Sequence, residues 1–218
     1  MNVLQLLIFD WDGTLMDSAA KIVACMQAAA RDVAVEEPTP EAVRDIIGLG
    51  LRHAMERLFP GHDEALFGSL TEQYRYHFVE ANQTPEQLFN GADDTLKQLE
   101  EAGYLLAIAT GKSRVGLDRS LQHTGLRKRF HVTRCADETR GKPHPQMLEE
   151  ILEVSGLAPQ HALMIGDTEY DLQMAASIGM PGVGVTYGVH SRERLLAQKP
   201  LSLLSDITHL PDWLKNRN

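Results

Sequence analysis

The chain has 218 residues, of which 43% are hydrophobic and 23% charged, the composition of an ordinary globular protein with one domain, or one domain carrying a smaller insert. Its formal net charge of −9 argues against non-specific binding to nucleic acid or to an anionic membrane, so an anionic substrate would need positive groups close by. No apolar run approaches the roughly 20 residues of a membrane span, and no basic signal-peptide region opens the sequence, so we expect a cytoplasmic protein.

Cysteine usage excludes two further classes. The only cysteines, Cys25 and Cys135, are far apart in the sequence, which supports neither a disulfide framework nor a zinc site with paired thiolates. We expect both to be buried free thiols. Length and charge are compatible with either a monomer or a homodimer.

The first predicted element is a short buried strand over residues 3–9, which ends abruptly at Asp10 and Asp12. From Ser18 onward the apolar residues recur at helical spacing. Further helices are predicted over residues 39–47, 51–59 and 63–82, separated by glycines and prolines. Four helices without an intervening strand predict a bundle-like, all-helical insert near residues 16–84.

After residue 85 the pattern alternates between helices and strands. Strands are predicted at 104–109, 130–135, 161–165, 183–187 and 201–204, with helices between them. This alternation predicts right-handed βαβ units and a parallel sheet covered by helices on both faces. The predicted fold class is therefore α/β.

Polar residues follow three of the predicted strands, and one lysine lies in a loop before a helix. They are Asp10, Asp12, Thr110, Lys142, Asp167 and Asp171. Because the ligand crevice of a parallel sheet lies beyond the carboxyl ends of its strands, we expect these groups to converge. Facing carboxylates repel unless a cation separates them, which suggests a magnesium ion. The alternative is that each aspartate only caps the helix that follows it.

Four segments resemble the ordered motifs of the haloacid dehalogenase-like hydrolase superfamily. They are FDWDGTL at 9–15, AT at 109–110, GKPHP at 141–145 and GDTEYD at 166–171. The resemblance spans nearly the whole chain. It implies a Rossmann-like catalytic core formed by residues 1–15 and 85–218, and a helical cap of the first type formed by residues 16–84.

The resemblance also implies a magnesium-dependent phosphatase that acts on a small phosphorylated metabolite through an aspartyl-phosphate intermediate. Asp10 is similar to the nucleophile, and Asp12 to the general acid and base. Magnesium would be held by the Asp10 carboxylate, the Asp12 backbone carbonyl and Asp167.

Three further roles follow from the same resemblance. Lys142 and the Thr110 hydroxyl would hold the transferring phosphoryl oxygens. Asp171 would act through water on the metal or directly on Lys142.

Single residues separate the other chemistries of this superfamily. Its dehalogenases lack the second acid of the first motif, and its phosphonoacetaldehyde hydrolases carry a small residue there and a Schiff-base lysine in the cap. This chain has Asp12, and Lys21 is the only lysine of its insert. Mutases of the β-phosphoglucomutase type share all four motifs, although they often have valine where this chain has Thr14. Such a mutase, and a non-catalytic binding member of the fold, remain the alternatives.

The segment IIGLGLRHAMERLF at 46–59 resembles the cap of bacterial phosphoglycolate phosphatases, as do KPHP at 142–145 and GVTYG at 184–188. Phosphoglycolate is therefore the first candidate substrate. Arg52 and His53 are candidates for contact with the leaving group; the alternative is an ordinary solvated helix face. Gly111, Lys112 and Ser113 have the appearance of a P-loop end, but Leu106 occupies the required upstream glycine position, which argues against a nucleoside triphosphate site.

Overall fold

A computed structural model describes residues 3–82, 84 and 86–217. Its centre is a six-stranded sheet in the order β5-β4-β1-β6-β7-β8, in which every neighbouring pair is parallel. In chain order, β4 and β5 are added on one side of β1, and β6, β7 and β8 are then added on its other side. The strands are β1 (Leu6–Phe9), β4 (Leu105–Thr110), β5 (Val132–Cys135), β6 (Ala162–Gly166), β7 (Gly182–Val185) and β8 (Ser202–Leu204).

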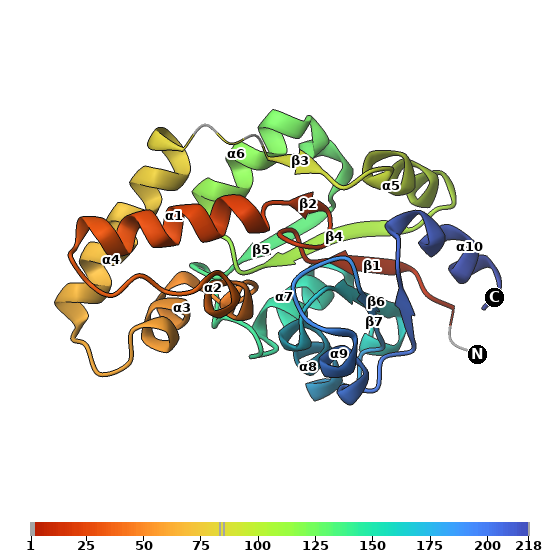
Figure 1. Ribbon diagram of the computed structural model, residues 1–218. Coiled ribbons are helices and arrows are strands. Elements are labelled where there is room, and N and C mark those ends of the chain that lie inside the picture. The colour runs from red at the N-terminus through yellow and green to blue at the C-terminus, as the bar shows by residue number, and fades with distance from the viewer. Residues whose placement is uncertain (1–2, 83, 85, 218) are drawn as a thin grey trace.

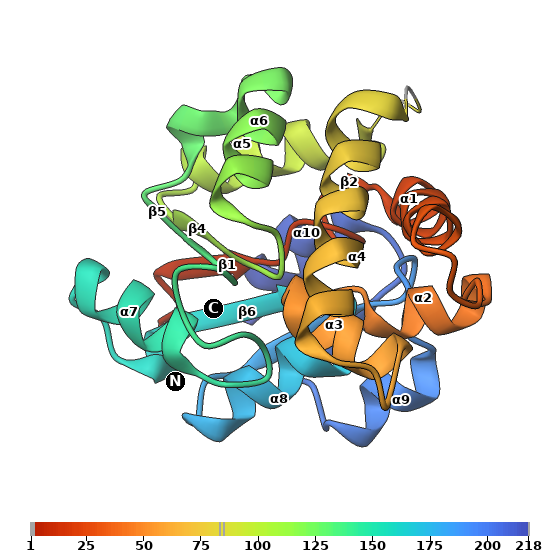
Figure 2. The same ribbon diagram turned by 90° about the vertical axis from the view of Figure 1, so that its left-hand side faces the viewer.

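Helices cover both faces of this sheet (Figures 1 and 2). Alternate residues of β1 point to opposite faces, so Leu7 and Phe9 belong to the core under α5, α6 and α10, whereas Leu6 and Ile8 belong to the core under α7 and α8. The helices of the core are α5 (Ala92–Glu101), α6 (Arg114–Thr124), α7 (Gln146–Ser155), α8 (Glu169–Ser177), α9 (Arg192–Ala197) and α10 (Leu210–Lys215). Three 3₁₀ turns accompany them: η2 (Leu126–Arg129), η3 (Pro159–His161) and η4 (Ile207–His209). The predicted α/β fold is confirmed.

The insert consists of four helices, as predicted, and packs around its own apolar cluster, which includes Met26, Val43, Met55 and Leu70. It lies at the left of Figure 1, beside the carboxyl ends of the strands. Its helices are α1 (Ala19–Asp32), α2 (Pro40–Ile46), α3 (Leu51–Leu58) and α4 (Glu64–Tyr76), and the last continues as a π-helical turn, η1 (His77–Ala81). The division into a cap of residues 16–84 and a core of the remainder stays a prediction, and residues 83 and 85 lie outside the described part of the chain.

The connections between insert and core contain a two-stranded antiparallel sheet that was not predicted from the sequence. It pairs β2 (Met16–Asp17), on the way into the insert, with β3 (Gln87–Leu88), on the way back. The first strand of the large sheet begins at Leu6, later than the predicted residue 3. Gln5, just before it, donates a backbone hydrogen bond to the His161 carbonyl at 2.8 Å and accepts one from the Leu105 N–H at 2.9 Å.

The insert is seated against the core along α2. The backbone carbonyl of Asp45 accepts a hydrogen bond from the Tyr170 hydroxyl at 2.9 Å, and its carboxylate pairs with Arg194. Nearby, Gly111 meets the insert backbone so closely that a Cβ atom there would lie 2.5 Å from the carbonyl oxygen of Gly48. Only glycine allows this approach, which holds the insert over the carboxyl edge of β4.

Both cysteines are buried free thiols, as expected. Burial raises the pKa of Cys25 to about 11 and that of Cys135 to about 12, so both remain protonated at neutral pH. None of the described helices is long and apolar enough to cross a membrane.

Candidate active site

Asp10 follows β1 directly and is almost completely buried, with 1% of its surface exposed. Its Oδ1 atom accepts a hydrogen bond from the Trp11 backbone N–H at 2.7 Å and lies 2.8 Å from Nζ of Lys142. Its Oδ2 atom is buried and has no hydrogen-bond partner among the described residues. A buried carboxylate oxygen without a partner is costly, so this atom is available to a ligand or a cation.

Asp167 follows β6, the strand next to β1, and its carboxylate is fixed on both sides. The Thr14 hydroxyl donates to Oδ1 at 2.9 Å, and the Val189 backbone N–H donates to Oδ2 at 3.0 Å. Gly13, with φ of 85°, passes so close that a Cβ atom there would lie 2.2 Å from Oδ2. Position 13 therefore has to be glycine, because the Asp167 carboxylate occupies the space that a side chain would need.

Asp171 lies in the first turn of α8 and forms a capping box with Thr168. Its Oδ2 atom accepts hydrogen bonds from the Thr168 hydroxyl at 2.7 Å and the Thr168 backbone N–H at 3.1 Å. Its Oδ1 atom lies 2.6 Å from Nζ of Lys142. The fully buried ammonium of Lys142 thus lies between Asp10 and Asp171, which is the direct contact that the sequence suggested for Asp171.

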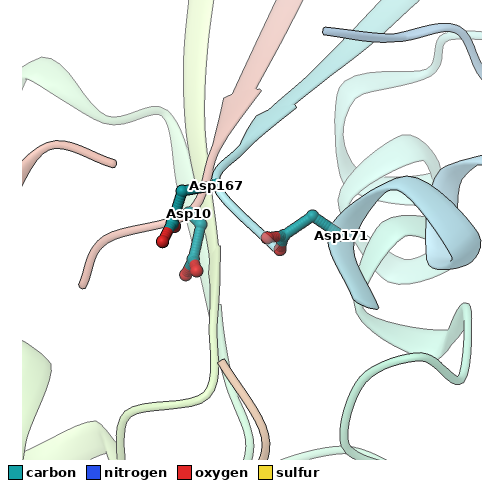
Figure 3. Close-up of side chains that lie close together, drawn as sticks. All are labelled: Asp10, Asp167 and Asp171. Atoms are coloured by element: carbon teal, nitrogen blue, oxygen red, sulfur yellow. The ribbon is translucent and has the colours of Figure 1, made fainter. Parts of the chain in front are cut away.

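One carboxylate oxygen from each of Asp10, Asp167 and Asp171 lies within 4.8 Å of the others, as Figure 3 shows for the three side chains. Lys142 is the only cation in contact with them among the described residues. Burial first, and then the neighbouring Asp171, raise the pKa of Asp167 to about 7. Burial also raises the pKa of Asp10, although Lys142 opposes that shift. Excess negative charge on buried oxygens fits a hard divalent cation such as magnesium.

Thr110 ends β4 and is completely buried; its hydroxyl oxygen accepts a hydrogen bond from the Lys112 backbone N–H at 3.2 Å. Asp10, Asp12 and Thr110 line a cavity of about 1040 Å³ between the core and the insert. Lys142 contacts Asp10 but is not among the residues that line this cavity.

The carboxylate of Asp12 does not belong to the three-acid cluster. It accepts a hydrogen bond from the Ser18 hydroxyl at 2.6 Å, and Nζ of Lys112 donates to its two oxygens at 2.9 and 3.2 Å. Lys112 also lies 3.5 Å from Glu86, in the connection that returns from the insert. From the sequence Lys112 is considered only as part of a P-loop-like segment, although a lysine two residues after the polar end of a buried strand is a usable signal for a site residue.

Arg52 and His53 both line the cavity, on the side of α3. The guanidinium of Arg52 is 62% exposed and is already paired with Glu56, at 3.0 Å, and with Glu64. His53 lies across from Gly141, where a Cβ atom would be 3.4 Å from its Nδ1 atom. Their contact with a leaving group stays a prediction.

Comparison with known proteins agrees with this fold. A family model described as haloacid dehalogenase-like hydrolase matches residues 7–185. A protein of Dickeya dadantii (strain 3937) named probable phosphatase IndB is 37% identical over 202 residues, which cover 89% of this chain and 86% of that protein. A 5′-nucleotidase of Pseudomonas aeruginosa is 28% identical over 211 residues, covering 96% of this chain and 95% of that protein.

A solved structure extends the likeness to three dimensions. The crystal structure of a predicted phosphoglycolate phosphatase from Haemophilus somnus 129PT is 25% identical, covers 96% of this chain and 97% of its own, and gives a TM-score of 0.84. The resemblance to the haloacid dehalogenase-like hydrolases is thereby confirmed over nearly the whole chain. The chain belongs to the haloacid dehalogenase-like hydrolase family.

Proposed function

We propose that this chain is a phosphatase that hydrolyses a phosphomonoester through an aspartyl-phosphate intermediate. The observation that carries the proposal is Asp10: it follows the central strand, lines the cavity and has a buried carboxylate oxygen without a hydrogen-bond partner. The names of the relatives, which include a phosphatase and a 5′-nucleotidase, support the same reaction class.

In the first half-reaction the Asp10 carboxylate attacks phosphorus, and the bond from phosphorus to the leaving oxygen breaks. Asp12 donates its proton to that oxygen, so the leaving group departs as an alcohol. In the second half-reaction Asp12 takes a proton from water, whose oxygen attacks phosphorus, and the bond to Asp10 breaks to release inorganic phosphate. The Thr110 hydroxyl would donate a hydrogen bond to a phosphoryl oxygen, and the Lys142 ammonium, which contacts Asp10, would offset part of the phosphoryl charge. Each such donor commonly lowers the barrier by about 2 to 4 kcal/mol.

The donor set fits magnesium, because only oxygen ligands converge and the negative charge exceeds the positive charge. Asp10, Asp167 and the backbone carbonyl of Asp12 would hold the ion, with Asp171 behind them. When bound, magnesium neutralises the charge of the phosphoryl group that approaches Asp10.

Magnesium removal gives the first prediction. We expect chelator to suppress phosphate release and added Mg²⁺ to restore it. Mg²⁺ should also raise the melting temperature, because an ion bound only to the native state stabilises it. This rise should shrink in Asp167→Asn and persist in Asp212→Asn, which changes an exposed aspartate of α10. Full activity in the presence of chelator, or an equal rise of the melting temperature in both variants, would show that the reaction does not use a magnesium ion at this site.

Lys112 gives the second prediction. Replacing Lys112 with methionine removes the cation shared by Asp12 and Glu86, so the two acids face each other without compensation. We expect kcat to fall about 100-fold, the usual contribution of a positioned acid–base group, with little change in KM. Lys97→Met, on the exposed face of α5, is the matched control. A raised KM with unchanged kcat would mean that Lys112 binds substrate instead of positioning Asp12.

A panel of esters tests the function itself. Phosphate release should be measured with Mg²⁺ for phosphoglycolate, sugar phosphates, nucleoside monophosphates and pyrophosphate. Phosphoglycolate is the first candidate from the resemblance of the cap and from the H. somnus protein. Release from none of these compounds would favour the mutase or the non-catalytic alternative.

A further inference from the structure

The cavity beside Asp10 is much larger than a leaving group of a few atoms requires. Its volume is about 1040 Å³, whereas pockets that enclose drug-sized ligands commonly measure about 300 to 1,000 Å³. Glycolate, the leaving group of phosphoglycolate, would leave most of this space to water. Size alone therefore favours a larger alcohol.

This volume does not come from a displaced insert. The insert already rests on the core through the hydrogen bond between Tyr170 and the Asp45 carbonyl, at 2.9 Å, and through the ion pair between Arg194 and Asp45. The Gly111 backbone meets the loop at Gly48 and Leu49 without space for a side chain. The cavity is therefore the space that remains between the insert and the core when they are in contact.

Part of the cavity wall is apolar and partly exposed. Eight large hydrophobic side chains of the described residues are exposed, and three of these line the cavity: Tyr76, Val79 and Val115, which are 49%, 39% and 68% exposed. Figure 2 shows α4, which leads into η1, beside α6, the two segments that carry these side chains. Apolar side chains that gather in a concave site mark a ligand surface.

Two of the cations that line the cavity already have carboxylate partners. Lys112, whose side chain is 8% exposed, is already paired with Asp12 and Glu86, and Arg52 with Glu56 and Glu64. Arg75 and Arg119 also line the cavity but are exposed, and the described residues give neither an ion-pair partner. A guanidinium plane without a carboxylate partner is a surface on which a ring can stack.

We propose that the leaving group of the substrate carries a planar ring, as a nucleoside does, and that the ring binds between η1 and α6. This inference rests on the proposed phosphatase function and names its substrate class. The phosphate end would lie at Asp10 and Thr110, and the ring would cover Val79 and Val115. A small anionic alcohol would use only the first of these two regions.

The test compares esters in which the phosphate is attached to the same kind of alcohol. UMP, AMP and ribose 5-phosphate all lose phosphate from a ribose primary alcohol, and only the nucleotides carry a base. With Mg²⁺, we expect kcat/KM to be at least about tenfold higher for one nucleotide than for ribose 5-phosphate and for phosphoglycolate. If either small ester equals or exceeds both nucleotides, the ring inference is wrong. If no ester releases phosphate, the proposed function itself has failed.

A pair of variants locates the ring. Replacing Val79 and Val115 together by serine should lower the preference for the nucleotide over ribose 5-phosphate about tenfold, because two apolar contacts are lost. Val154→Ser changes a valine of α7 that is 53% exposed and lies outside the cavity, so it should keep the preference of the parent. An unchanged preference in the double variant, or equal losses for both esters, would place the ring elsewhere and overturn this assignment.

Discussion

Asp10→Asn is expected to lower phosphate release by about 10⁴-fold or more, because removal of a nucleophile leaves only the catalysis that binding and electrostatics supply. An amide neither attacks phosphorus as a carboxylate does nor forms a stable aspartyl phosphate. The measurement is steady-state phosphate release with Mg²⁺ on the best ester of the panel.

The fold should survive this substitution. Burial already disfavours the charged form of Asp10 and raises its pKa, so a neutral amide removes an unfavourable charge from the site. We expect a melting temperature at least equal to that of the parent in the absence of metal. Asp94→Asn, at an exposed position of α5, serves as the control and should retain full activity. Parental activity in the Asp10 variant would overturn the nucleophile assignment.

Lys142→Met is expected to reduce both stability and turnover. The ammonium lies 2.8 Å from Asp10 and 2.6 Å from Asp171 with no exposed surface, and its removal leaves buried carboxylates without a cation. Breaking such a buried pair from one side typically costs about 3 to 5 kcal/mol. Turnover should fall as well, because Asp10 loses the partner that favours its charged form.

Urea unfolding without metal measures the loss of stability, and phosphate release with Mg²⁺ measures the loss of turnover. Lys215→Met is the matched control, since that lysine is 71% exposed and its pair with Asp212 is a surface contact worth about 1 kcal/mol or less. If the Lys142 variant unfolds at the same urea concentration as the parent, its ammonium does not hold the acids together.

The sheet could be predicted because buried parallel strands leave continuous apolar runs in the sequence. The predicted strand at 104–109 is β4 (Leu105–Thr110), and the one at 161–165 is β6 (Ala162–Gly166). The pairing of β2 with β3 could not be predicted, because each strand has only two residues and the paired residues Asp17 and Gln87 are 70 positions apart in the sequence. No local period encodes so short a pairing.

For the site, few contacts could be predicted beyond the polar residues at the strand ends themselves. The convergence of Asp10, Asp167 and Asp171 followed from their positions after neighbouring strands. Lys112 lies 100 positions from Asp12, and their contact depends on how the connection after β4 turns. Arg52 lines the cavity, but its pairing with Glu64 joins two helices of the insert, which spacing within one helix does not reveal.

The contact at Gly111 bears on how the substrate specificity of such an enzyme can change during evolution. There the insert touches the core through the carbonyls of Gly48 and Leu49, and not through side chains. Substitutions on the cavity-facing surfaces of α1 and η1 therefore leave this contact unchanged. The insert can acquire a different specificity while it docks on the same catalytic core in the same place.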